Sequence, residues 1–556
     1  MKKYIGAAIG NCVHIGGAVN FLRLAEQEGN EIIFLGAAVS IDKLVEKVIE
    51  LKPDIVAVGY RLTAQNVVPL LKELERQIDE KKLDHCQWIF GGTKPVAEEA
   101  RKFSYFSKIF DGLEDLDDVI NYLRNQQKKE AMDSYPDNII DRIESKYPYP
   151  VLRHHFGLPS LEDTLEGIKM IAESKVLDII SIGPDQNAQQ FFFTPEKMDQ
   201  DLDGAGGVPL RSVEDLSSLY EASKRGNFPL LRCYSGTGEV FKFAEVLINT
   251  IRNAWCAVPL CWYNVLDGRG TRPVAESISE GQKLMIWHAT RNVPIEVNEA
   301  HHWSLRDAHD TIGVVMAYIA AYNAKKMGVK QYIAQYMFNV PPTMHHKMDL
   351  AKMLAKVELI ESLEDSSFKT YRQVRAGLAS LSADLDVAKG QLAASTYLAM
   401  SIKPHIIHVV GFSEADHAAK PEDVIESTKI VRGVIRSTLG GMADMSQDET
   451  VRQRKRELIE EAGFLLDTIR SLYPHSKDPF CDPIVLADII KRGIIDAPHL
   501  KGNESAKGTL ETRIIDGKCL AYSRELGREV TERERLQELL DTAENRMFLS
   551  SKLVNY

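Results

Sequence analysis

Three short loops combine a histidine with glycines in a pattern that could hold a metal-containing cofactor. The first, Asn11–Gly17, reads Asn-Cys-Val-His-Ile-Gly-Gly and carries His14. The second is Gly59–Thr63, and the third holds Gly91 and Gly92. Imidazole is a common metal ligand, and glycine lets the backbone approach a bulky group closely. Each loop alone is typical of an ordinary turn, so the pattern gains meaning only if one fold brings the three loops together.

A second group of polar residues lies at the ends of apolar segments between residues 150 and 415. Glu414 follows the very apolar segment 406–410, where a carboxylate without a role would be costly. Tyr263 is equally consistent with simple packing inside a barrel and with a role in an active site. Adjacent histidines on a strand point to opposite faces, so we do not expect the pairs at 154–155, 301–302 and 345–346 to hold zinc or iron. The candidates are His154, His155, Asp185, Tyr234, Tyr263, Asn264, Asn298, Glu299, His301, His302, Gln335, Arg375 and Glu414.

The elements that must position the three loops alternate regularly over residues 4–125. This alternation predicts a doubly wound parallel sheet, in which ligands bind beyond the carboxyl ends of the strands. The loops with His14 and with the paired glycines fall at those ends. We expect strands at 4–9, 31–35, 55–58, 88–90 and 108–110, and helices near 17–28, 41–51, 65–78, 95–103 and 115–125.

Eight further strand-like segments, each followed by a helical one, predict a (β/α)₈ barrel whose site lies at the carboxyl ends of its strands. We expect domain boundaries at 1–125, a polar linker at 126–150, the barrel at 151–440 and a helical extension at 441–556 with a strand-rich piece near 512–528. The expected barrel strands are 151–157, 177–185, 229–236, 254–264, 293–301, 329–338, 368–377 and 404–414.

The composition limits the function classes. With 556 residues, a net charge of -11 and no apolar run long enough to cross a bilayer, the chain predicts a soluble, multidomain protein that binds neither nucleic acid nor membrane. The seven scattered cysteines give no disulfide framework or zinc spacing, and no signal peptide precedes the first strand, so we expect a cytoplasmic protein.

The three N-terminal loops together resemble the flavodoxin-like cobalamin-binding domain of mutases and methionine synthases. That family has Asp-x-His-x-x-Gly after strand one, Ser-x-Leu after strand three and Gly-Gly after strand four. The resemblance implies that His14 is the lower axial ligand of cobalt. It also implies that the displaced nucleotide tail lies along the sheet. The matching cofactor-binding positions are Cys12, His14, Gly17, Tyr60, Leu62, Thr63, Gly91 and Gly92.

Two of these positions depart from the family pattern. Cys12 replaces the aspartate that would accept a hydrogen bond from the metal-bound histidine, and a thiol is a poorer acceptor. Tyr60 replaces a serine and would crowd the nucleotide tail unless its ring turns away.

The barrel and extension are similar to the catalytic subunit of glutamate mutase (methylaspartate mutase) over most of residues 150–545. This resemblance implies an isomerase that uses adenosylcobalamin, whose cobalt–carbon bond breaks homolytically so that the adenosyl radical removes a substrate hydrogen. The matching stretches are Leu231–Thr237, Trp262–Val265, Met327–Lys330, Ser413–Ala415, Gly493–Pro498, Asn503 and Ala506–Gly508.

When the family's active-site residues are carried over by position, some are present in this sequence and others are replaced. Tyr263, Asn264, Glu299 and Glu414 match catalytic positions, and Glu414 matches the glutamate that binds the adenosyl ribose. Val410 replaces the lysine that would share this work. The family's three substrate arginines are absent, so glutamate is not the expected substrate. The substrate-side positions are His154, His155, Gln189, Arg232, Tyr234 and Asp267.

The sequence therefore predicts an adenosylcobalamin-dependent radical isomerase that acts on a small molecule other than glutamate. The alternatives are a non-catalytic cobalamin binder or sensor derived from a mutase, and a corrinoid methyltransferase. The methyltransferase is disfavoured because those proteins carry a helical cap ahead of the cobalamin domain. Candidate partners are the small-molecule substrate, a second copy of the chain in a homodimer, and a cobalamin-reactivating chaperone.

Overall fold

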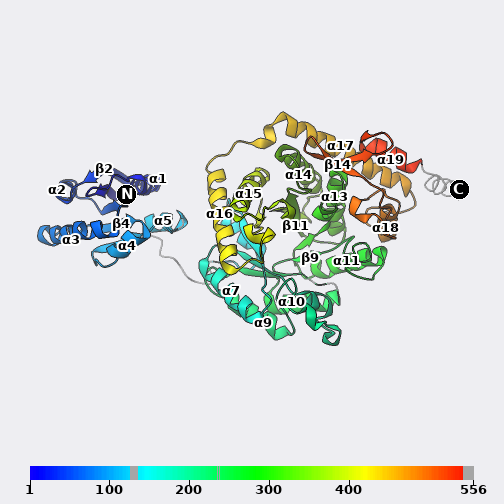
Figure 1. Cartoon of the computed structure of the whole chain (residues 1–556), viewed down its shortest axis with the longest axis horizontal. Helices are drawn as coiled ribbons and strands as arrows, with labels where there is room; N and C mark the ends of the chain where they lie inside the picture. Colours follow the sequence, from blue (N-terminus) through cyan, green and yellow to red (C-terminus); the bar gives the residue numbers. More distant parts are fainter. Residues whose placement is uncertain (115, 125–134, 235, 237, 542–556) are drawn as a thin grey trace. The chain divides into compact units, whose positions relative to one another are not determined.

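The computed structural model describes residues 1–114, 116–124, 135–234, 236 and 238–541. The chain divides into two compact units, Met1–Ser134 and Tyr135–Tyr556 (Figure 1). Residues 126–134 of the expected linker and residues 542–556 of the expected extension lie outside the described residues.

The N-terminal unit is a five-stranded sheet in which every pairing is parallel and the strand order is β2-β1-β3-β4-β5. All five expected strands are confirmed, and β2 and β3 run a few residues further than predicted. The strands are β1 (Lys3–Ile9), β2 (Glu31–Val39), β3 (Ile55–Tyr60), β4 (Gln87–Gly92) and β5 (Phe106–Phe110).

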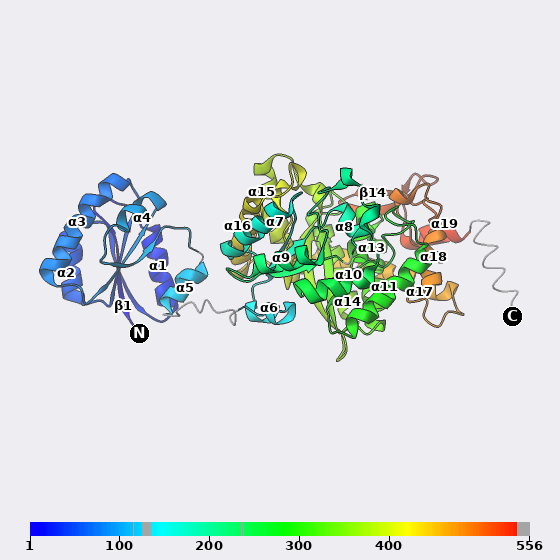
Figure 2. The ribbon, with the colours of Figure 1, turned by 90° about the horizontal axis from the view of Figure 1, so that it is seen from below.

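Helices cover both faces of this sheet, because its strands carry apolar side chains on both faces and these must be buried. Helices α1 and α5 lie on one face and α2 and α3 on the other (Figure 2). Helix α2 shows why: its apolar residues recur at helical spacing and are buried, and the Ser40 hydroxyl caps its first turn by accepting from Lys43 N at 3.3 Å. The helices are α1 (Gly16–Gln27), α2 (Ile41–Leu51), α3 (Ala64–Lys81), α4 (Lys94–Ala100) and α5 (Leu116–Leu123).

The second unit is built on an eight-stranded parallel sheet that closes almost completely into a barrel. Its order is β8-β7-β6-β13-β12-β11-β10-β9, so the chain winds around once. At the gap between β8 and β9, Ala254 N still donates to Leu231 O at 3.0 Å. The eight expected strands are confirmed in number and order, but several are shorter than predicted, and those expected at 254–264, 293–301 and 404–414 are three residues each. The strands are β6 (Val151–Phe156), β7 (Ile179–Ile182), β8 (Leu230–Cys233), β9 (Cys256–Val258), β10 (Ile295–Val297), β11 (Gln331–Phe338), β12 (Lys369–Ala376) and β13 (Ile406–His408).

Helices surround this sheet and return the chain from each strand to the next. The helices of the barrel are α7 (Leu161–Ser174), α8 (Gln186–Phe191), α9 (Val213–Ser223), α10 (Val240–Ile251), α11 (Val274–Ala289), α12 (Glu299–His302), α13 (Asp310–Lys326), α14 (His346–Glu361), α15 (Leu385–Ala399) and α16 (Pro421–Leu439). No helix among the described residues is both long enough and apolar enough to cross a membrane.

Part of the expected linker is a helix that covers the amino-terminal end of the barrel. Helix α6 (Ile139–Lys146) buries Ile139 and Ile143 against Val151 and Trp255 at the strand starts. Lys146 forms an ion pair with Asp178 at 2.8 Å. The carboxyl ends of the strands are therefore the end that remains for a site.

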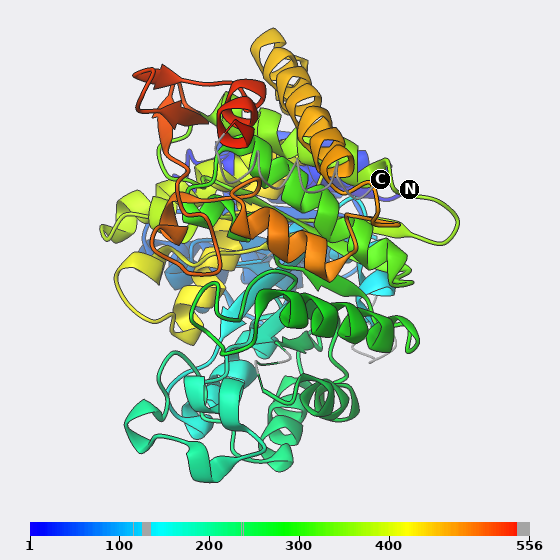
Figure 3. The ribbon, with the colours of Figure 1, turned by 90° about the vertical axis from the view of Figure 1, so that its right-hand side faces the viewer.

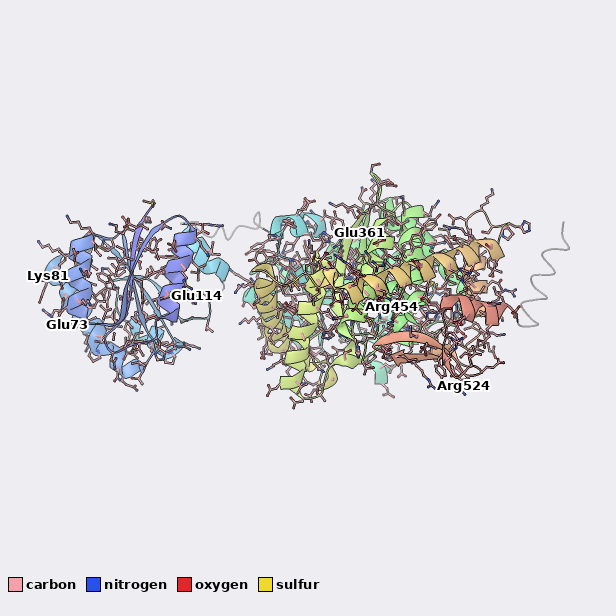
Figure 4. The ribbon with its side chains drawn as sticks, turned by 90° about the horizontal axis from the view of Figure 1, so that it is seen from above. Glu73, Lys81, Glu114, Glu361, Arg454 and Arg524 are labelled. Atoms are coloured by element: carbon pink, nitrogen blue, oxygen red, sulfur yellow. The ribbon has the colours of Figure 1, made fainter. Side chains whose placement is uncertain are left out.

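The C-terminal extension packs beside the barrel helices, on the side that faces the viewer in Figure 3. Helix α17 (Glu449–Leu472) carries Arg454 (Figure 4) and lies against α13 and α14. Arg454 pairs there with the buried Asp310 at 3.3 Å. The extension comprises α17 (Glu449–Leu472), α18 (Pro483–Lys491), β14 (Thr512–Ile515), β15 (Lys518–Ser523), β16 (Arg528–Glu529) and α19 (Glu532–Leu540), which confirms the strand-rich piece expected near 512–528.

Candidate cofactor groove and barrel cavity

A groove of about 710 Å³ runs over the sheet of the N-terminal unit, on the face covered by α1 and α5. Its walls are largely apolar and include Phe21, Leu24 and Val119 from the two helices. Its floor comes from the carboxyl-terminal halves of β3 and β4. Five of the predicted cofactor positions line it together: His14, Gly17, Tyr60, Gly91 and Gly92.

Three glycines, Gly59, Gly91 and Gly92, lie in the floor of this groove. Gly59 and Gly91 pair directly across β3 and β4. A Cβ added at Gly91 would meet no atom within 4 Å, so it would project into open space. A Cβ at Gly92 would lie 2.8 Å from Tyr60 O. Larger residues here would fill the groove or displace the neighbouring strand, so the glycines keep room for a flat or extended ligand.

His14 is exposed at the open end of the groove, in the loop between β1 and α1. Its Nδ1 lies 4.0 Å from the Sγ of the buried Cys12, and that sulfur accepts from Arg61 N at 3.3 Å. This places Nδ1 toward the protein and leaves Nε2 as the ring nitrogen free for a metal ligand. The weak sulfur contact takes the place of the carboxylate that usually orients such a histidine.

Tyr60 belongs to the groove lining, but its side chain is almost fully buried in the core and its hydroxyl donates to Asn11 Oδ1 at 3.1 Å, so its ring does not crowd the groove. Leu62 packs against the same core, Thr63 is the N-cap residue of α3, and neither lines the groove. The exposed imidazole of His14 and the open glycine positions of the groove are the features that the expected cofactor site would need.

A cavity of about 340 Å³ opens at the carboxyl ends of the barrel strands. It brings together eight of the predicted residues: His154, His155, Gln189, Tyr234, Tyr263, Asn298, Arg375 and Glu414. Apolar and glycine positions supply most of the remaining wall, namely Gly183, Pro184, Gly206, Gly236, Ala257, Pro259, Leu378, Val409, Val410 and Gly411.

Beneath this cavity, two arginines and one glutamate form a closed charge network inside the barrel. Arg153 and Arg232 lie 3.7 Å and 3.3 Å from the Glu296 carboxylate, which also accepts from Trp255 Nε1 at 2.8 Å. Burial opposes the charge on Glu296, but the two arginines outweigh it and lower the pKa of this carboxyl. Arg232, predicted as a substrate ligand, is fully buried in this layer and does not line the cavity.

The cavity floor carries histidines held in the neutral state. Nε2 of His155 accepts from Arg153 at 3.0 Å and lies 3.2 Å from the hydroxyl of Tyr234, whose ring stacks on the imidazole. Because arginine only donates, this neutral ring carries its proton on Nδ1. Burial, with Arg153 and Arg232 adding, lowers the pKa of His155 well below its usual value. His408 lies 4.8 Å from His155, centroid to centroid, and its pKa is lowered by the same burial.

Three predicted residues turn out to hold the loop after β9 in place. Glu299 accepts from Leu260 N at 3.0 Å and Cys261 N at 2.5 Å, and burial raises its pKa to about 7. Asp267 accepts from Tyr263 N, and Asn264 accepts from the backbone of the same loop. The three side chains do not line the cavity, and their contacts fix Tyr263 at its edge.

One cavity residue was not among the predicted candidates: His408, the last residue of β13. Arg375, which was predicted, lies next to the end of β12 and lines the cavity as well. His408 lies in the middle of an apolar segment, and nothing in its local sequence set it apart. Among the described residues, no group of three or more His, Cys, Asp or Glu is arranged to hold a metal ion.

No protein-family model matches the chain. Similar solved structures include a cobalamin-binding protein from Desulfitobacterium hafniense DCB-2, with 21% identity over 22% of this chain and 56% of that protein and a TM-score of 0.20. OxsB, a cobalamin-dependent S-adenosylmethionine radical enzyme, is 12% identical over 100% of this chain and 81% of its own, with a TM-score of 0.17.

A GH138 enzyme that targets pectin rhamnogalacturonan II is 9% identical over 88% of this chain and 56% of its own length, with a TM-score of 0.31. The chain thus spans 56% of the length of two of these three proteins. All three TM-scores are below 0.5, so the functional assignment rests on the groove and the cavity themselves.

Proposed function

We propose that the chain is a cobalamin-dependent radical isomerase that rearranges a small molecule in its barrel cavity. The observation that carries this proposal is the apolar groove that has glycines in its floor and His14 at its open end. An exposed imidazole beside an apolar groove with glycines in its floor suits a corrinoid with its nucleotide tail extended. The strand order of this unit is the flavodoxin-like one, whose ligands bind at the switch point where His14 lies.

In this proposal residues 1–125 bind the cofactor, residues 126–150 link it to the barrel, residues 151–440 are catalytic and residues 441–556 support the barrel. Adenosylcobalamin supplies an organic radical when bound. The barrel residues would hold the substrate and exclude water. Tyr234 and Tyr263 give the cavity aromatic walls, and His155 offers its Nδ1–H as a neutral donor.

Glu414 is the proposed anchor for the adenosyl group. It lies in the short 3-10 turn Phe412–Ala415 that follows β13, and it lines the cavity. Val410 lies at the same wall, so no lysine shares this position. A carboxylate accepts two hydroxyl hydrogen bonds, as a ribose diol requires. Asn264 and Glu299 are assigned to positioning the loop rather than to chemistry, because their hydrogen bonds are made within it.

The cofactor assignment is tested by titrating the purified chain with hydroxocobalamin and following the visible spectrum. We expect saturable binding with the spectrum of the form whose own base has left the cobalt. Unchanged free-cobalamin spectra would contradict the assignment.

The reaction class is tested by anaerobic electron paramagnetic resonance of the chain loaded with adenosylcobalamin and exposed to fractions of a metabolite pool. A coupled cob(II)alamin–radical signal in one fraction is expected and would lead to the substrate. Tight cofactor binding without such a signal in any fraction would favour a non-catalytic cobalamin binder instead.

A further inference from the structure

Two polar side chains point from the barrel strands into the cavity. Alternate residues of a strand face the same side, and Gln373 on β12 accepts from Arg153 at 2.7 Å inside the barrel. Arg375, two residues further along β12, therefore faces the interior one layer nearer the cavity. Tyr234 follows the buried Arg232 by the same spacing. Both Arg375 and Tyr234 line the cavity.

The half-buried guanidinium of Arg375 is placed to bind an anion. Its Nε makes a long hydrogen bond of 3.4 Å to Ala376 O, which leaves its two terminal nitrogens for a ligand. Among the described residues no carboxylate forms an ion pair with Arg375, and Glu414 favours its charge only from beyond that distance. Burial lowers the pKa of Arg375, so an anionic ligand group would stabilise its charged form. A carboxylate suits the flat fork of a guanidinium best.

Tyr234 offers a second hydrogen-bond donor near Arg375. Its hydroxyl lies 3.2 Å from Nε2 of His155, but Arg153 already donates to that nitrogen at 3.0 Å. A neutral imidazole nitrogen has one lone pair, so the tyrosine hydrogen can turn to a ligand in the cavity. Of the titratable groups around Arg375, Tyr234 acts on it most strongly, which indicates that the two donors are neighbours.

The charged layer beneath the cavity also favours an anion. Arg153 and Arg232 share the single carboxylate of Glu296, at 3.7 Å and 3.3 Å, so this layer keeps one net positive charge. Burial, followed by the effect of Arg232, lowers the pKa of Arg153 to about 9, so Arg153 stays charged at neutral pH. An anion at the cavity floor is attracted by this charge, and a cation is repelled.

The rest of the cavity wall disfavours a second anionic group on the ligand. Arg375 is the lysine or arginine of this lining among the described residues, so a second carboxylate would find no second guanidinium. Glu414, which is exposed and lines the same cavity, would repel it. Ala257, Val409 and Val410 offer apolar surface, which suits a carbon chain.

We propose that the barrel cavity binds a small monocarboxylic acid, with its carboxylate on Arg375 and Tyr234 and its carbon chain against the apolar wall. The volume of about 340 Å³ lies at the lower end of small-molecule sites, which suits a short chain. This inference names the substrate class of the proposed function, and it rests on that function only in taking this cavity as the substrate site.

The test is calorimetric titration of the full chain at neutral pH, without added cobalamin, with a matched set of four-carbon ligands. These are butyrate, its uncharged amide butyramide, the dianion succinate and the cation butylammonium. We expect butyrate to bind at least about 10-fold more tightly than each of the other three. Butyrate that binds no better than butyramide would overturn the proposal, and so would tighter binding of succinate or butylammonium, without recourse to any variant.

Substitutions then assign the contacts. Arg375→Gln should weaken butyrate by about 10- to 100-fold and leave butyramide unchanged, and Arg375→Lys, which keeps the charge without the fork, should weaken butyrate by less. Tyr234→Phe keeps the ring and should weaken butyrate by about 3- to 10-fold. The control is Arg252→Gln, which removes an exposed arginine paired with Asp137 and should not change the affinity. Unchanged butyrate binding in the folded Arg375 variants would also overturn the proposal.

Cobalamin titration of the same preparation separates this inference from the proposed function. Cobalamin binding through His14 without a preference for butyrate would remove the substrate class alone. A preference for butyrate without cobalamin binding would remove the cofactor assignment and leave the cavity's ligand class standing.

Discussion

At the scale of the residue, the charged side chains inside the barrel fall into two groups. Some are paired with each other in a buried layer, and others line the cavity. Glu296 neutralises much of the charge on Arg153 and Arg232, so that layer stabilises the barrel. Arg375, which is half-buried, and Glu414, which is exposed, line the cavity instead. Their charged groups are therefore placed where a ligand could contact them.

Glu414→Gln should weaken the binding of adenosylcobalamin by about 1–3 kcal/mol, because the amide has one acceptor oxygen in place of two. Hydroxocobalamin has no adenosyl group, so its binding should stay unchanged. Equilibrium titration of both cofactors on both proteins measures the difference. Equal losses for the two cofactors would show that Glu414 serves the structure of the 3-10 turn instead.

At the scale of the element, the strands and helices followed from the sequence and several side-chain roles did not. Strand periodicity located all thirteen parallel strands of the two sheets, because apolar runs between turn residues carry that information locally. The pairing of Glu299 with the backbone of Leu260 and Cys261 could not be predicted in this way. It depends on how the loop after β9 folds over α12, which is a long-range contact.

The need for long-range information also explains why the sequence did not show which arginine lines the cavity. Arg232 and Arg375 both lie near strand ends, but strand alternation and barrel tilt decide which one reaches the cavity. Helix α6 was missed because the sequence of this segment is mostly charged and was interpreted as a linker. Ile139 and Ile143 are buried only because they cover the end of the barrel, which the local sequence does not reveal.

The floor formed by β3 and β4 gives a prediction at this scale. Gly91→Val should abolish cobalamin binding with little loss of fold stability, because the added side chain points into the open groove rather than at a neighbour. Gly390→Ala, on a barrel helix with equally open space, is the control. Spectroscopic cobalamin titration and thermal unfolding measure the two effects. Normal cobalamin binding by the Gly91→Val protein would place the nucleotide tail elsewhere.

At the scale of the whole molecule, buried neutral histidines make the barrel sensitive to acid. The pKa is lowered, with burial as the leading cause, for His154, His155, His288, His301, His302, His405 and His408. Each of these histidines gains a proton more readily when the chain unfolds. Their stabilising contribution is therefore present above the ordinary pKa of about 6.5 and is lost as the pH falls toward the folded-state pKa.

His288 isolates one such contribution away from the cavity. Burial lowers its pKa to about 4, and its Nδ1 contacts Leu284 O at 2.9 Å. Its buried Nε2 has no hydrogen-bond partner among the residues that the structure describes. His288→Leu should reduce the loss of unfolding free energy between pH 7 and pH 5 by up to about 2 kcal/mol. Denaturant unfolding at the two pH values measures it. The same acid loss in both proteins would contradict a neutral, buried His288.

In the proposed function His14 would replace the cofactor's own base on cobalt, and one measurement tests this most directly. Cob(II)alamin bound to the chain is examined by electron paramagnetic resonance with histidine carrying either nitrogen-14 or nitrogen-15. If His14 is the ligand, the hyperfine lines change from triplets to doublets with the label, and the His14→Ala protein loses this response. Lines that keep the triplet of the cofactor's own nitrogen in both labelled proteins would contradict the claim.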